Sequence, residues 1–506
     1  MSHLLSECSE SPPYVVNGKS HLWYLQKYFA ETGARTIVVE SAYVDRDYLE
    51  DYAAYYVRSF YPYKRYCSRL HFFRSEFDES RFQSELLGCD NPLVKEEEYL
   101  GYIVVKPLPR TIIGRTCLRT YDETNERRFP VVRRYEISLF GLSLGINAIA
   151  YQEQDSTVAA CASTAIWSAF QRSGALFHHT IPSPVEITRA ATKHFPFANR
   201  HFPNKGLSPE QMAHAIRSVG LEPLLASYKS PAQLKSLVYS FLQAEIPVAL
   251  GFMLYANDHP PRPVGRHAAC VLGYRIDTPA TSPYPGEPNF FLKSSRVSGF
   301  YVHDDQVGPY ARMNFESGFG NGLAVLSTSF GQVSGEPESH LALPEVAIIP
   351  LNHKIRIGHD LVLDLIIRLN TIVHDIDSFV LQGEIGAIEW NLELGYSNVI
   401  KSEIAAAVEL EAPVRVQLLT KSMPKYLWHA KASGKGRSIS FLFDATDIDQ
   451  GSLLVGIIPS SEDLIGLLQI ALLPETIANI EDFQLRKVLQ EITDYLRPSA
   501  EEFHIV

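Results

Sequence analysis

The chain has 506 residues, of which 46% are hydrophobic and 20% are charged, and it carries a net charge of −11 with an isoelectric point near 5.9. This composition is ordinary for a globular protein and argues against long disordered segments. The acidic balance disfavours non-specific binding to nucleic acid or to an anionic membrane surface. A chain of this length exceeds a single hydrophobic core, so we expect roughly three domains.

The six cysteines show no paired spacing and no Cys-x-x-Cys motif, so the sequence predicts neither a disulfide scaffold nor a cysteine-based zinc site. The first residues lack the basic start and the apolar core of a signal peptide. No apolar run approaches the roughly 18 residues that span a bilayer. We therefore expect a cytoplasmic protein without a membrane span, without a cofactor and without a nucleic-acid partner.

The expected fold class is α+β. Residues 1–145 are predicted to form a mixed α/β domain of unknown role. Its predicted elements are strands at 36–40, 99–105 and 111–120 and a helix at 45–60. Tyr48, Tyr52, Tyr55 and Tyr56 recur on one face of that helix, a pattern typical of a core or of a contact between domains.

Residues 146–335 are predicted to form the central domain. Its predicted helices lie at 158–173, 209–219 and 231–244, and its predicted strands at 247–254, 267–274, 290–293 and 300–304. Residues 336–506 are predicted to form a strand-rich domain with strands at 414–419, 438–443 and 453–458 and a final amphipathic helix at 483–496. We expect this last domain to be an interaction module.

Cys161 is the candidate nucleophile because it falls near the start of a predicted helix, with possible caps at Asp155, Ser156 and Thr157. A helix start stabilises a thiolate through its unpaired N–H groups and its dipole. The small side chains around this cysteine, such as Ala160 and Ala162, leave room for a substrate backbone.

A thiolate needs an imidazole partner that later protonates the leaving group, and His267 opens an apolar strand that can supply it. The imidazole in turn needs an acceptor, which Asp304 provides if its strand lies beside that of His267. Asp304 and Asp305 are expected to point to opposite faces of a strand, so only one of them serves. Gln154, with Gln152 as the second choice, is the candidate side-chain donor to an oxyanion, beside the backbone N–H of Cys161.

These motifs resemble those of the papain-like cysteine peptidase clan, in particular the bacteriocin-leader-processing (double-glycine) peptidase-like domains. That family carries a glutamine before Cys-(Gly/Ala)-x-x-Ala, then His-(Ala/Phe)-x-x-Val-x-Gly-Tyr, then Val-x-Asp-Pro-x-x-Gly. The chain offers Gln154, Cys161-Ala-Ser-Thr-Ala165, His267-Ala-Ala-Cys-Val-Leu-Gly-Tyr274 and Val302-His-Asp304-Asp-Gln-Val-Gly308. The spacing from the glutamine to the cysteine is one residue longer than in the family, and Asp305 stands where the family has a proline.

The resemblance covers about residues 150–315. It implies a papain-like domain in which a catalytic helix packs on an antiparallel sheet. It also implies that Cys161 is the nucleophile, His267 the general base and acid, Asp304 the orienting residue and Gln154 the oxyanion donor.

The sequence therefore predicts a cysteine peptidase or a related thiol-dependent acyl hydrolase that acts on a peptide, isopeptide or amide bond of a peptide or protein substrate. Two alternatives use the same domain: an inactive scaffold that binds a protein partner, and a transglutaminase-like acyl transferase. A metal site is a third, since eight of the 17 histidines fall between His178 and His303. None of these eight has the i, i+4 spacing of helical zinc motifs, so no metal is expected.

Overall fold

A computed structural model describes the chain except residues 89–94, 156, 195–205, 259, 279–281, 318–321, 331–339, 380–386, 409, 436, 448–451, 460–471, 473–476, 479, 482 and 497–506. The chain divides into two compact units. Unit 1 comprises Met1–Lys229, Glu245–Ile276 and Ser298–Asn352, and unit 2 comprises Ser230–Ala244, Asp277–Val297 and His353–Val506. These units differ from the three consecutive domains that the sequence predicts.

The physical reason is that distant segments share sheets and cores. The strand at 127–128 pairs with the strand that carries His267, so no boundary separates residues before and after 145. In the same way, the segments Ser230–Ala244 and Asp277–Val297 belong to the C-terminal unit.

Unit 1 contains eight α-helices among its described residues. They are α1 (Ser2–Ser9), α2 (Pro13–Asn17), α3 (Ser20–Thr32), α4 (Arg46–Ala54), α5 (Glu79–Leu86), α6 (Cys161–Phe177), α7 (Pro184–Thr192) and α8 (Pro209–Arg217), with short 3-10 turns η1 (Tyr56–Arg58) and η2 (Glu96–Glu98). Its first strands are β1 (Thr36–Tyr43), β2 (Cys67–Phe73), β3 (Tyr99–Val105), β4 (Ile113–Leu118), β5 (Arg127–Arg128), β6 (Arg133–Leu139) and β7 (Leu142–Ala148). The later strands are β8 (Glu222–Ala226), β9 (Val248–Ala256), β10 (Arg262–Ile276), β12 (Val297–Asp304, beginning one residue before the unit), β13 (Gly308–Phe315), β14 (Leu326–Thr328) and β15 (His340–Leu351).

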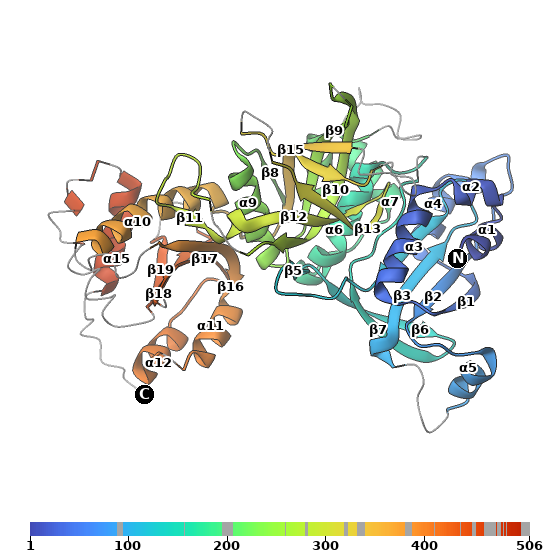
Figure 1. The fold of residues 1–506 in the computed structure, drawn as a ribbon, viewed down its shortest axis with the longest axis horizontal. Helices are drawn as coiled ribbons and strands as arrows, with labels where there is room; N and C mark the ends of the chain where they lie inside the picture. Colours follow the sequence, from blue (N-terminus) through green and yellow to red (C-terminus); the bar gives the residue numbers. More distant parts are fainter. Residues whose placement is uncertain are drawn as a thin grey trace. The chain divides into compact units, whose positions relative to one another are not determined.

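The N-terminal part of unit 1 is built on an antiparallel sheet in the order β1-β2-β3-β4, of which Figure 1 shows β1, β2 and β3 side by side. Helix α3 packs on it through Phe29, whose ring stacks on that of Phe72 at 3.9 Å. The predicted helix at 45–60 is shorter in the structure, since α4 ends at Ala54 and continues as η1. Tyr48 and Tyr56 are buried, as expected for a core stripe, whereas Tyr55 is 38% exposed.

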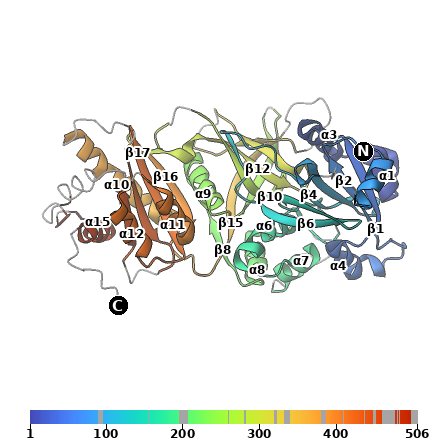
Figure 2. The ribbon, with the colours of Figure 1, turned by 90° about the horizontal axis from the view of Figure 1, so that it is seen from below.

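The central sheet of unit 1 has eight strands in the order β12-β13-β14-β15-β9-β10-β5, with β8 paired to β15. Because β12 also pairs with β10, six of these strands close into a ring. Helix α6 packs against β10 and β9, and α7 and α8 lie beside it (Figure 2). Trp167 and Phe170 of α6 are completely buried. The closure places the end of β12 beside β10, the strand that carries His267.

Unit 2 combines a sheet in the order β11-β16-β17-β18-β19 with five α-helices among its described residues. The strands are β11 (Phe291–Leu292), β16 (Glu389–Tyr396), β17 (Tyr426–Gly434), β18 (Arg437–Asp444) and β19 (Leu454–Pro459). The helices are α9 (Pro231–Gln243), α10 (His359–Phe379), α11 (Ser397–Ala406), α12 (Ala412–Thr420) and α15 (Phe483–Leu496), with the 3-10 turn η3 (Lys293–Arg296). The description of the C-terminal third as strand-rich is therefore incomplete.

The predicted strand at 414–419 is wrong, because these residues lie in helix α12. Pro413 occupies the first turn of this helix, where a proline is favourable. Leu418 packs with Ile400 and Ile404 of α11, and Val414, one helical turn earlier, packs against the same cluster. A short apolar run fits a strand and a helix equally well, and here the packing partner decides.

The remaining elements fit the expected class. Antiparallel pairing dominates both units, and helices and strands are both abundant, so the fold class is α+β. No helix among the described residues is long and apolar enough to cross a membrane.

Candidate active site

Cys161 is the first residue of helix α6, and Ala160 is its N-cap. The predicted start at 158 was therefore three residues early. Asp155 and Thr157 precede the helix, and Ser156 lies outside the described residues. Asp155 instead holds the preceding loop, since its Oδ1 accepts a hydrogen bond from the Thr157 N–H at 3.0 Å and its carbonyl accepts one from the Ala159 N–H at 2.9 Å. The thiol thus sits directly at the helix end that favours negative charge.

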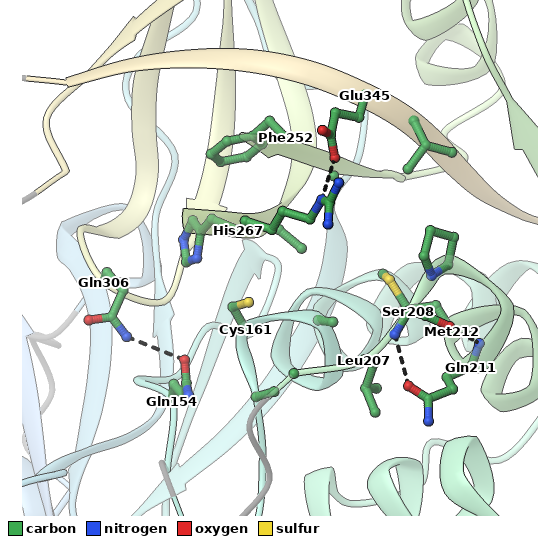
Figure 3. Close-up of a pocket in the computed structure, with 18 of the residues that line it drawn as sticks. Gln154, Cys161, Leu207, Ser208, Gln211, Met212, Phe252, His267, Gln306 and Glu345 are labelled. Carbon is green, nitrogen blue, oxygen red and sulfur yellow. Dashed lines mark hydrogen bonds and ion pairs between the residues drawn. The ribbon is translucent and has the colours of Figure 1, made fainter. Parts of the chain in front are cut away.

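His267 faces the same cavity from β10, and its side chain is 6% exposed. Its ring is flanked edge-to-face by Phe252 at 5.4 Å and by Phe330 at 5.3 Å. Its Nε2 lies 2.9 Å from Oδ1 of Asp304, and the nearby Cys161 thiol is among the groups that raise the pKa of the ring. Because Nε2 is engaged by the carboxylate, Nδ1 is the ring nitrogen that a nucleophile would use. Figure 3 shows Cys161 and His267 on opposing walls of the cavity.

Asp304 and Asp305 both face the imidazole, which corrects the expectation that they point to opposite faces. Oδ1 of Asp305 lies 3.6 Å from Nε2 of His267, and both carboxylates are buried. The alternation of a strand does not apply because β12 ends at Asp304 and the chain turns. Oδ1 of Asp304 accepts a hydrogen bond from the Gln306 N–H at 3.0 Å, and its carbonyl accepts one from the Val307 N–H at 3.0 Å.

The two carboxylates set the protonation of the site. Burial lowers the pKa of His267, but the charge and the hydrogen bond of Asp304, the hydrogen bond to Cys161 and the charge of Asp305 outweigh it, so this pKa lies well above 6.5. Burial, opposed by the charge of His267 and reinforced by that of Asp304, raises the pKa of Asp305 to about 6. At neutral pH the arrangement therefore favours an imidazolium beside two carboxylates.

This acid pair predicts a specific pH dependence. Asp305 ionises above its pKa of about 6, and its charge then helps to stabilise the imidazolium. We expect kcat/KM to fall as the pH drops through about 6, because protonated Asp305 no longer supports the charged His267. In Asp305→Asn this acid limb should disappear from the profile, leaving a lower and flatter plateau. An unchanged limb near pH 6 in the variant would assign it to another group.

Gln154 lines the cavity, as expected of an oxyanion donor, despite its unusual spacing from Cys161. Its Oε1 accepts a hydrogen bond from Nε2 of Gln306 at 3.4 Å, an arrangement that leaves the Gln154 amide N–H groups available to a ligand. Gln152 does not line the cavity and is 5% exposed. Of the two glutamines, Gln154 is therefore the one placed for the role.

Gln306 is a site residue that the sequence reasoning missed. Besides its contact with Gln154, its Nε2 donates to Oδ2 of Asp305 at 2.9 Å. It therefore links the acid pair to the candidate oxyanion donor. The available signal was a polar residue directly after two acids, in a turn before Gly308.

The cavity has a volume of about 1090 Å³. Small residues form part of its floor, and the larger apolar groups include Met212, Phe252 and Val346. The exposed Arg266, which also lines the cavity, pairs with Glu345 at 2.9 Å. A volume of this order lies at the upper end of the range of about 300–1,000 Å³ found for ligand pockets.

His267, Asp304 and Asp305 also have one potential ligand atom each within 4.8 Å of one another, so these three side chains can in principle hold a metal ion. A histidine ligand must be neutral, whereas both carboxylates favour a proton on His267. The residues therefore fit a charged imidazole better than a metal ligand. The helical spacing considered in the sequence did not anticipate this cluster, because its members come from a strand and a turn.

No protein-family model matches this chain, and no curated protein matches it either.

Proposed function

We propose that the protein is a papain-like cysteine peptidase or a related thiol-dependent acyl hydrolase that cleaves a peptide, isopeptide or amide bond. The observation that carries this proposal is the meeting of Cys161 from α6 and His267 from β10 at one cavity, with Asp304 at the end of β12 bonded to the imidazole. These residues lie far apart in the sequence, and their meeting in the fold supports a role in nucleophilic catalysis.

In the proposed reaction, the proton of the Cys161 thiol already resides on His267 as an imidazolium–thiolate ion pair, and the thiolate sulfur attacks the carbonyl carbon of the substrate. The oxyanion that forms accepts hydrogen bonds from the Cys161 N–H and the Gln154 amide. His267 then gives its proton to the leaving amine as the C–N bond breaks, which leaves a thioester on Cys161. A water molecule, deprotonated by His267, attacks this thioester and releases the carboxylic acid and the free thiol.

Asp304 keeps the imidazole oriented through its 2.9 Å contact with Nε2 and stabilises the imidazolium. Phe252 and Phe330 shield the ring from water and so strengthen these charge interactions. The presence of the thiol and the imidazole at the same cavity supports an enzyme over an inactive scaffold. The large cavity supports a peptide or protein substrate.

Selective alkylation tests this proposal. Cys8 and Cys161 are the two described cysteines that are partly exposed, whereas Cys67, Cys117 and Cys270 are buried. Burial raises the pKa of Cys8 as well as that of Cys117, the latter to about 11. We expect iodoacetamide at pH 7 to modify Cys161 at least about tenfold faster than Cys8, because the imidazole activates only the former. Equal rates at the two positions would contradict the proposal.

A matched pair of glutamine variants tests the oxyanion donor. We expect Gln154→Ala to lower kcat by about 10²-fold with little change in KM, because the donor acts on a charge that develops only in the transition state. Gln152→Ala should leave kcat within about twofold of the wild type, although it alters a buried side chain. If the two variants have the same kcat, the assignment to Gln154 is wrong.

A further inference from the structure

Helix α3 contacts the turn that carries the acid pair. Nε2 of His21 donates to the carbonyl of Asp305 at 2.7 Å, and the hydroxyl of Ser20 donates to the carbonyl of Gln306 at 3.1 Å. The hydroxyl of Tyr24 donates to the carbonyl of Pro309 at 2.6 Å. The ring of Tyr24 also packs so closely on Gly308 that a side chain there would collide with it. Helix α3 therefore contacts this turn along its length, and the hydroxyl of Tyr151 also donates to the carbonyl of Asp305, at 3.3 Å.

The 3-10 turn η1 contacts the other half of the site. The hydroxyl of Tyr56 donates to Oδ2 of Asp155 at 2.6 Å, and both side chains are buried. Asp155 is the residue whose Oδ1 and carbonyl hold the loop leading to Cys161. Tyr56 thus fixes the anchor of the nucleophile loop, although it does not line the cavity itself.

The two elements that make these contacts, α3 and η1, are both attached to the sheet β1–β4. Helix α3 packs on β2 through Phe29 and Phe72. Helix α4, which leads into η1, is tied to β4 by the ion pair of Asp47 and Arg115 at 2.5 Å. The sheet β1–β4 therefore sets the separation between the point that holds the acid turn and the point that holds the nucleophile loop.

We propose that the N-terminal residues are part of the catalytic apparatus, with His21 and Tyr56 as positioning residues that set the distance between Cys161 and the acids behind His267. This inference rests on the proposed function and gives a role to an N-terminal segment that the sequence left unassigned. Neither residue touches the reacting atoms. Each acts through one hydrogen bond to a loop, and displacements of about 1 Å in such loops cost about 10²-fold in rate.

Tyr56→Phe in the full chain removes only the hydroxyl that holds Asp155. We expect kcat to fall about tenfold or more with KM within about twofold, and the alkylation of Cys161 to slow in parallel. Tyr48→Phe is the matched control, because this buried tyrosine donates to the carbonyl of Lys64 at 2.7 Å in the same cluster. Both variants lose one hydrogen bond and should melt alike, but Tyr48→Phe should keep the wild-type kcat.

His21→Leu tests the acid turn, and His21→Gln restores a donor at the same place. We expect His21→Leu to lower kcat about tenfold and to move the acid limb of the pH profile away from about 6, because Asp305 shifts relative to His267. His21→Gln should recover most of both properties. A purely structural role would change the melting temperature without moving the pH limb.

The outcomes separate this inference from the proposed function. If the wild type turns over substrate, and Tyr56→Phe and Tyr48→Phe have the same kcat, the positioning role is wrong while the proposed function stands. A pH limb that does not move in His21→Leu would equally overturn the role of His21. If the wild type shows neither turnover nor selective alkylation of Cys161, the proposed function is wrong, and so is this inference, which rests on it.

Discussion

Replacing Cys161 with alanine is expected to lower turnover by about 10⁴-fold or more, because this residue carries the only thiol among the described residues that line the cavity. The free energy of unfolding should change by no more than about 1 kcal/mol. The substitution removes one partly exposed sulfur at the first position of α6 and leaves the helix backbone intact. Steady-state kinetics with a peptide or amide substrate, together with thermal unfolding, measures both effects.

Cys8→Ala is the control for this experiment, since Cys8 is also partly exposed and lies at no proposed site. It should retain full turnover. Wild-type turnover that persists in Cys161→Ala would contradict the assignment of the nucleophile. The alanine variant should still bind the uncleaved substrate, which provides a direct way to identify that substrate.

Replacing His267 with alanine should abolish turnover to a similar extent and, unlike the change at Cys161, should also destabilise the fold. In this variant, Asp304 and Asp305 remain buried but lose the positive charge of His267. Removing one partner of a buried ion pair costs about 3–5 kcal/mol. Denaturant unfolding at pH 7 measures this loss.

The destabilisation should depend on pH in a defined direction. Because the pKa of His267 is raised on folding, the stability from its protonation is fully present below about pH 6.5 and is lost as the pH rises through the folded-state value. In His267→Ala the carboxyls must instead take up protons to stay buried, and this costs less as the pH falls. We therefore expect the stability gap between variant and wild type to narrow from pH 7 to pH 5. A gap that widens over this range would contradict the account.

A double variant separates stability from catalysis. Asp305→Asn added to His267→Ala removes one of the two stranded charges, so it should recover part of the lost stability at pH 7. It should recover no turnover, since the general base is still missing. Recovery of turnover would show that His267 acts only through the fold.

Local elements were largely predictable from the sequence, and contacts between distant segments were not. The strand Tyr99–Val105 and the helix Phe483–Leu496 begin and end where their apolar patterns predict. The pairing of β12 with β10 brings Asp304 to His267. The sequence suggests a role for Asp304 only if these two strands are neighbours, and it does not predict that they are. It depends on the closure of a ring of strands, and no local pattern encodes that closure.

The details of the site show the same limit. The prediction that Asp305 points away from His267 is wrong because a turn, not a strand, follows Asp304. The role of Gln306 depends on the same turn, so the sequence alone does not reveal it. Gln154 is one residue further from the cysteine than in the family that the motifs resemble, yet the loop before α6 places it at the cavity. The contacts of His21 and Tyr56 join residues about a hundred or more positions apart, beyond what a single sequence can reveal.

The most direct test of the central claim is covalent labelling of the native protein with a peptide-like electrophile, with the modified residue mapped by mass spectrometry. The account predicts a single adduct on Cys161, formed at neutral pH and lost in His267→Ala. Labelling spread over several cysteines, or labelling of Cys161 that does not depend on His267, would contradict a thiol site activated by this histidine.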